Sequence, residues 1–179
     1  IVTDFDPDTY VATVTGCGGE IPAVEADLFI GNSGTTVRFL TAAVAVGRGS
    51  YRLDGVPRMR ERPIQDLLDA LRQWGVEADS ELGTGCPPVI IKANQIAGGS
   101  ATVAGNISSQ YLSGLLMAAP YARGIAQGTE PSEQSELSRL EVSGDLVSRP
   151  YVDMTIAIMR EFGAEVREEK NGFVIPARQ

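Results

Sequence analysis

The feature that most constrains the fold is a series of predicted elements that occurs twice along the chain. Residues 26–93 are predicted to form strand, helix, strand, helix, strand and strand, and residues 94–179 repeat this order. The pairs Gly31-Asn32 and Gly105-Asn106 lie 74 residues apart, which is too long for a solenoid unit. The copies also match at Gly55 and Gly144, at Pro63 and Pro150, and at Gly75 and Gly163. We therefore predict an α/β (α+β) fold built from repeated βαβαββ units.

The first helix of each copy, at residues 34–46 and 111–119, is apolar around nearly its whole circumference. A helix of this kind is buried, so sheets and amphipathic outer helices are expected to surround these central helices. Both helices begin at turns rich in Gly, Ser and Thr, and their starts should converge on one face. Helix starts offer unpaired N–H groups and the positive end of a dipole, so this face is the predicted site for an anionic ligand.

Further expectations concern the limits of the units. Residues 1–179 are expected to be most of one domain, with residues 1–25 as the tail of a preceding unit. An insertion near residues 123–138, rich in Gly, Glu, Ser and Gln, is predicted to be a mobile surface loop. The chain begins at Ile1 inside a predicted strand, which is typical of a piece of a longer protein.

Composition narrows the classes of function. The net charge of −8 argues against a nucleic-acid partner, yet Arg58, Arg60 and Arg62 cluster in a way that suits a small anionic ligand. Because histidine is absent, acid–base chemistry near neutral pH would need carboxylates, Lys, Tyr or groups from another domain. The sequence has no metal-ligand spacing and no run of ~20 apolar residues, so neither a metal nor a membrane is expected. Two distant cysteines favour a reduced, cytoplasmic protein.

The turn Gly31-Asn32-Ser33-Gly34 has two interpretations on spacing alone. Glycine lets a ligand approach the backbone, and Arg38, one turn into the helix, adds a full charge, which favours a phosphate or carboxylate site. A glycine turn that only reverses the chain fits the same spacing.

Four longer motifs follow one another along the chain. They are Gly31-Asn32-Ser33-Gly34-Thr35-Thr36-Val37-Arg38, Leu53-Asp54-Gly55-Val56-Pro57-Arg58-Met59-Arg60-Glu61-Arg62-Pro63, Ser108-Ser109-Gln110-Tyr111-Leu112 and Gly144-Asp145-Leu146-Val147-Ser148-Arg149-Pro150-Tyr151. Their order and spacing resemble those of the 5-enolpyruvylshikimate-3-phosphate (EPSP) synthase family over nearly the whole chain. The resemblance implies transfer of the enolpyruvyl group of phosphoenolpyruvate to the 5-hydroxyl of shikimate 3-phosphate, with release of phosphate and without a cofactor. It also implies two similar domains of three βαβαββ units each, which close over the substrates.

The resemblance carries roles to individual residues of this chain. Shikimate 3-phosphate would be bound by Ser108, Ser109, Gln110, Ser148 and Tyr151. Phosphoenolpyruvate would be bound by Gly34, Arg58 and Gln110, with Arg58 and Gln110 as the catalytic pair and Arg58 pairing with the phosphate. Asn32, Thr35, Arg38 and Arg62 would support the site. Two competing interpretations stay open, a plain helix N-cap for Ser148 and packing against the buried helix for Tyr151, while Glu61 is expected to pair with a neighbouring arginine.

The chain departs from the family's pattern in two ways. Phe39 stands where many members have proline, and Ser33 replaces the common alanine, which leaves the position of Gly34 and the sensitivity to phosphoenolpyruvate mimics such as glyphosate open. The family's N-terminal lysine segment and the second domain, which brings acidic residues for proton transfer, are not in the sequence. We therefore expect the isolated chain to be inactive and its partner to be the missing domain.

Two other functions remain open. A UDP-N-acetylglucosamine enolpyruvyl transferase would share the fold but uses a loop cysteine near its site, whereas Cys86 precedes Pro87-Pro88 at a strand entrance. A non-catalytic binding or assembly module of the same fold would use the face left open by the missing domain to bind another chain.

Overall fold

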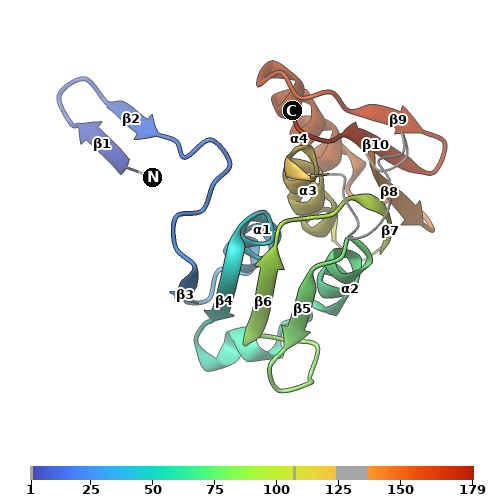
Figure 1. Cartoon of the computed structure of the whole chain (residues 1–179), viewed down its shortest axis with the longest axis horizontal. Helices are drawn as coiled ribbons and strands as arrows, with labels where there is room; N and C mark the ends of the chain where they lie inside the picture. Colours follow the sequence, from blue (N-terminus) through green and yellow to red (C-terminus); the bar gives the residue numbers. More distant parts are fainter. Residues whose placement is uncertain (1, 107, 124–136) are drawn as a thin grey trace.

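The computed structural model describes residues 2–106, 108–123 and 137–179, so the predicted loop near 123–138 lies almost wholly outside the described residues. The first unit comprises β3 (Glu25–Phe29), α1 (Gly34–Val44), β4 (Arg48–Asp54), α2 (Gln65–Gln73), β5 (Glu77–Ser80) and β6 (Val89–Asn94). The second comprises β7 (Gly99–Ala104), α3 (Ser109–Ala118), β8 (Leu137–Ser143), α4 (Arg149–Glu161), β9 (Arg167–Glu169) and β10 (Gly172–Pro176). Figure 1 shows the two units one after the other along the chain.

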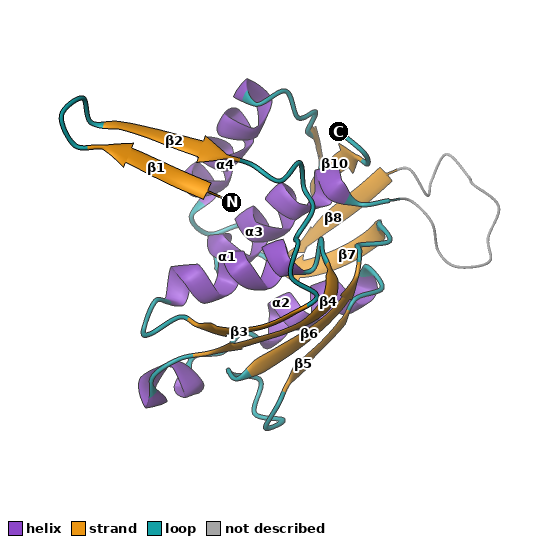
Figure 2. Ribbon diagram, turned by 60° about the vertical axis from the view of Figure 1, so that its left-hand side comes forward, coloured by secondary structure: helices purple, strands orange, loops and turns teal. Residues whose placement is uncertain are grey.

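Sheet topology confirms the predicted repeat. The strand orders are β3-β4-β6-β5 and β7-β8-β10-β9, and in each sheet the first two strands are parallel while the other pairs are antiparallel. The return of the chain after the second strand is also repeated, because the N–H of Val56 donates to the carbonyl of Gly31 and that of Val147 to Gly105. Residues of the predicted tail form the hairpin of β1 (Val2–Asp6) and β2 (Val11–Thr15), which lies apart from both sheets (Figures 1 and 2).

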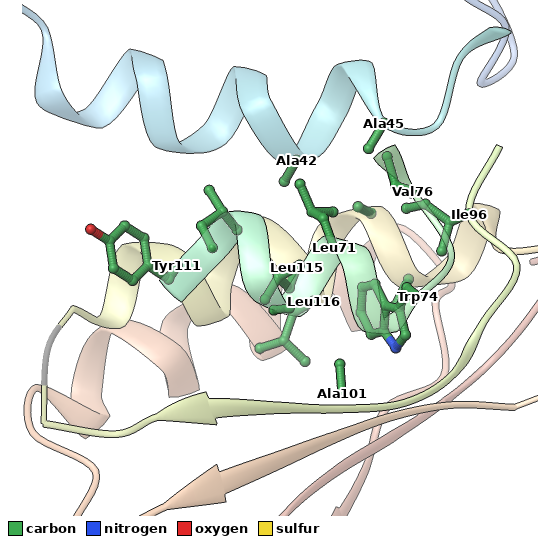
Figure 3. Packing of buried hydrophobic residues seen from close by; sticks show 14 of the residues in the cluster. Ala42, Ala45, Leu71, Trp74, Val76, Ile96, Ala101, Tyr111, Leu115 and Leu116 are labelled. Atoms are coloured by element: carbon green, nitrogen blue, oxygen red, sulfur yellow. The ribbon is translucent and has the colours of Figure 1, made fainter. Parts of the chain in front are cut away.

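Helix α3 forms the centre of the core, as its apolar pattern predicts. Seven of its ten residues are buried, and it packs against α1 on one side and α4 on the other (Figure 2). Helix α2 joins the two units, because it contacts both β5 and β7 and the indole N–H of the buried Trp74 beside its end donates to the carbonyl of Gly99 at 3.0 Å. Figure 3 shows Leu71 and Trp74 in the same apolar cluster as Leu115 and Leu116.

The structure corrects one detail of the predicted elements. Helix α1 is not buried on all sides, because Ala43 is exposed and Phe39 and Leu40 are only partly buried. These three residues line an apolar hollow of about 730 Å³. The apolar residues on this face of α1 therefore face the hollow and are not covered by another described segment. A 3₁₀ helix, η1 (Pro57–Glu61), lies between β4 and α2.

A second short 3₁₀ helix, η2 (Ala119–Tyr121), follows α3 directly. None of the helices in the described ranges has the length and apolar character needed to cross a bilayer.

Candidate functional site

The starts of α1 and α3 lie side by side, as their turn sequences predict. Ser33 caps α1 by accepting a hydrogen bond from the N–H of Thr36, and Ser108 caps α3 by accepting one from the N–H of Gln110. The side chain of Gln110 joins the two helices, because its amide nitrogen donates to the Thr35 hydroxyl at 3.0 Å. The amide of Gln110 is therefore fixed between the two helix starts.

Arg38 supplies the positive charge of this region. Its guanidinium donates to the Gln110 carbonyl oxygen at 2.6 Å and lies over the ring of Tyr111, 5.2 Å from the ring centroid. Tyr111 is itself buried, its hydroxyl donates to the carbonyl of Pro63 at 2.6 Å, and burial raises the pKa of that hydroxyl. A neutral, anchored ring thus holds Arg38 in place.

At the start of α4, the side chains of Ser148 and Tyr151 are neither capping the helix nor buried in the core. Ser148 has left-handed backbone angles, φ 61° and ψ 33°, and its side chain makes no capping hydrogen bond. Ser148 therefore occupies the N-cap position of α4, but its side chain does not cap the helix. Tyr151 is 61% exposed, so its side chain is not packed into the core against α3. Both side chains are available to a ligand.

A pocket of about 460 Å³ lies between the starts of α3 and α4. The residues that line it are Arg38, Phe39, Ser108, Ser109, Gln110, Ser113, Val147, Ser148, Tyr151, Met154 and Thr155. Among these described residues Arg38 alone is charged, so the pocket combines one guanidinium, two helix starts and several hydroxyls without a carboxylate. This combination suits an anion that carries hydroxyl groups.

The structure brings Arg62, and not Arg58, to the first glycine turn. A Cβ added to Gly34 would overlap the guanidinium of Arg62, which has no acidic partner in the described part of the chain. Arg58 is exposed and forms an ion pair with Glu61, which is the arginine partner expected for Glu61. That Gly34 and Arg58 bind one ligand stays a prediction, but in the structure η1 places Arg58 on the surface and Arg62 at Gly34.

Asp54 holds the segment that carries Arg62. Its carboxylate accepts hydrogen bonds from Arg60, at 3.0 and 2.6 Å, and from the N–H of Gly55 at 2.8 Å. The hydrogen bond from Arg60, followed by the one from Gly55, holds the pKa of Asp54 below its usual value. Gly55 leaves no room for a side chain, because a Cβ there would collide with the carbonyl of Gly31. The segment after β4 is thereby fixed against the first glycine turn.

Most, but not all, of the other residues predicted for the site lie at the pocket. All the residues predicted for shikimate 3-phosphate line the pocket, whereas Asn32 is exposed and does not. Ser113 and Thr155 also line the pocket but were not predicted from the sequence, although their position four residues after Ser109 and Tyr151 puts them one helical turn below the helix starts. Cys86 lies in the connection between β5 and β6, where its carbonyl accepts from Ser80, and it does not line the pocket.

The chain matches known proteins in sequence and in fold. The family model described as EPSP synthase (3-phosphoshikimate 1-carboxyvinyltransferase) matches residues 2–179. The 3-phosphoshikimate 1-carboxyvinyltransferase of Paraburkholderia phytofirmans is 48% identical over 178 residues, which cover 97% of this chain and 38% of that protein. The chloroplastic 3-phosphoshikimate 1-carboxyvinyltransferase of Solanum lycopersicum is 47% identical over 176 residues, which cover 94% of this chain and 31% of that protein.

The fold is similar to that of a solved structure, EPSP synthase from Acinetobacter baumannii, with a TM-score of 0.67 and 22% identity. That match covers 86% of this chain and 31% of the solved one. The chain thus spans between 31% and 38% of the length of these proteins.

We expect Asp54→Asn to lower the melting temperature at pH 7 by about 2–4 °C, the shift that roughly 1 kcal/mol produces in a chain of this size. Because the folded-state pKa of Asp54 lies below 3.8, the ionised carboxylate stabilises the fold above about pH 4, and this contribution is lost as the pH falls through the folded-state value. Thermal melts from pH 7 to pH 2.5 should therefore bring variant and wild type together at low pH. Asp27→Asn, at an 81% exposed side chain, is the matched control. A deficit that persists unchanged to the lowest pH would contradict this role.

Proposed function

This chain belongs to the EPSP synthase family, and we propose that it forms the part of the enzyme that holds shikimate 3-phosphate. The complete protein would transfer the enolpyruvyl group of phosphoenolpyruvate to the 5-hydroxyl of shikimate 3-phosphate and release phosphate. Because the chain spans only 38% of the Paraburkholderia relative, the groups that move protons would come from a second domain. The isolated chain would bind substrate without turning it over, and we propose the cytoplasm as its location.

The observation that carries this proposal is the pocket between the starts of α3 and α4. Ser108 and Ser109 from the start of α3 and Ser148 from the start of α4 would surround the phosphate, because all three line the pocket where the two helices begin. The exposed ring of Tyr151 would lie against the shikimate ring, with its hydroxyl free to bond a ring substituent. Arg38 would raise the positive potential of the whole pocket.

Phosphoenolpyruvate would bind beside this pocket, at the first glycine turn. Gly34 lets an anion reach the start of α1, and the Arg62 guanidinium next to it has the fork of donors that a phosphate takes up. We therefore assign to Arg62 the role that the sequence analysis gave to Arg58. Gln110, which is hydrogen bonded to both Thr35 and Arg38, lies between the two proposed positions and would contact both substrates.

Calorimetric titration with shikimate 3-phosphate tests the first half of the proposal. We expect the chain to bind it, and Ser109→Ala to weaken binding about 10-fold or more, because a donor to a charged group is worth roughly 1.5–3 kcal/mol. Ser143→Ala, at an exposed residue outside the pocket lining, serves as the control. Equal affinity in wild type and Ser109→Ala would rule out the proposed phosphate position.

The proposed phosphoenolpyruvate position is tested by adding phosphoenolpyruvate to the chain saturated with shikimate 3-phosphate. Arg62→Ala should weaken phosphoenolpyruvate binding about 10-fold or more, because a bidentate contact to a phosphate is lost. Arg58→Ala should leave it within about 2-fold, because Arg58 is engaged with Glu61 on the surface. The reverse order of the two variants would restore Arg58 as the phosphate ligand.

A further inference from the structure

We propose that Ser113 and Thr155 are positioning residues that set the distance between the two halves of the anion pocket. This role rests on the proposed function. The groups that would surround the phosphate come from two separate helices, Ser108 and Ser109 from α3 and Ser148 and Tyr151 from α4. A contact between α3 and α4 must therefore fix the distance between the starts of the two helices.

Ser113 and Thr155 connect the two helices through their hydroxyls, whose oxygens are 2.8 Å apart. The Thr155 hydroxyl donates to the backbone carbonyl of Tyr151 at 2.9 Å. Because its one proton is used there, Thr155 is the acceptor in the contact with Ser113. The hydrogen bonds therefore run in one direction, from Ser113 on α3 through Thr155 to the carbonyl of Tyr151 on α4.

This link lies directly under the proposed site. Ser113 is four residues after Ser109, and Thr155 is four residues after Tyr151, so each lies one helical turn below a proposed ligand-binding residue. Both residues line the pocket, and Ser113 is only 3% exposed. Within the described ranges, no other side-chain hydrogen bond joins α3 to α4. A hydroxyl pair is satisfied over only a few tenths of an ångström, so this link can fix the distance between α3 and α4.

The repeat provides an internal comparison. The match of Pro63 with Pro150 aligns Leu68 of α2 with Thr155 of α4. Leu68 is fully buried in the apolar core, so the unit folds with a purely apolar side chain at this position. The hydroxyl is present in the second unit, where the pocket lies, and absent from the first. This difference indicates a role in the site beyond packing.

The test compares three single variants and one double variant by titration with shikimate 3-phosphate. Thr155→Val keeps the shape of the side chain but removes the hydroxyl, and we expect it to weaken binding about 3- to 10-fold. Thr155→Ser keeps the hydroxyl and should stay within about 2-fold of wild type. Ser113→Ala should match Thr155→Val, and the double variant should be no weaker than the weaker single one, because both changes break the same link.

Ile156→Val is the control for general loss of stability, because Ile156 is buried in the same helix and carries no hydroxyl. It should lower the melting temperature without changing the affinity. Unchanged affinity in Thr155→Val, while Ser109→Ala binds weakly, would overturn the positioning role and leave the proposed function standing. An equal loss in Thr155→Ser or Ile156→Val would also overturn it. Absence of binding by the wild-type chain would contradict the proposed function itself, and this role with it.

Discussion

The close parallel packing of α1 against α3 is the contact on which the candidate site depends. Gly114 makes it possible, because a Cβ at this position would already lie 3.3 Å from the Cβ of Ala42. With the helices this near, Arg38 of α1 and Gln110 of α3 reach each other, and the glycine turn of the first unit lies next to the serine turn of the second. A bulkier residue at the crossing would separate the two helix starts, and with them the two proposed substrate positions.

A chain with a net charge of −8 presents a positive site because its arginines are divided between two tasks. Arg149 adjoins Ser148 but forms ion pairs with Asp153 and Glu168, so its charge is neutralised on the surface. Arg38 and Arg62 lack acidic partners in the described part of the chain. The acidic residues thus select which guanidinium groups remain for a ligand.

The fold followed from the sequence because its signals are local and repeated. Apolar periodicity located α3, the Gly-Ser-Thr turns located the helix starts, and the matched glycines and prolines revealed the second unit. The identity of the arginine beside Gly34 could not be predicted, because it depends on the hydrogen bonds of Asp54 that shape η1. The pairing of Ser113 with Thr155 joins residues 42 positions apart, and no local pattern announces such a contact.

The central claim is that one anion is held where α3 and α4 begin. The most direct test is to follow the backbone amide signals of the isotopically labelled chain by NMR during addition of shikimate 3-phosphate. We expect the largest shifts at Ser109, Gln110 and Tyr151, with small shifts around Arg48 and Arg123 at a separate hollow. Shifts confined to that second hollow, or an unchanged spectrum at millimolar ligand, would contradict it.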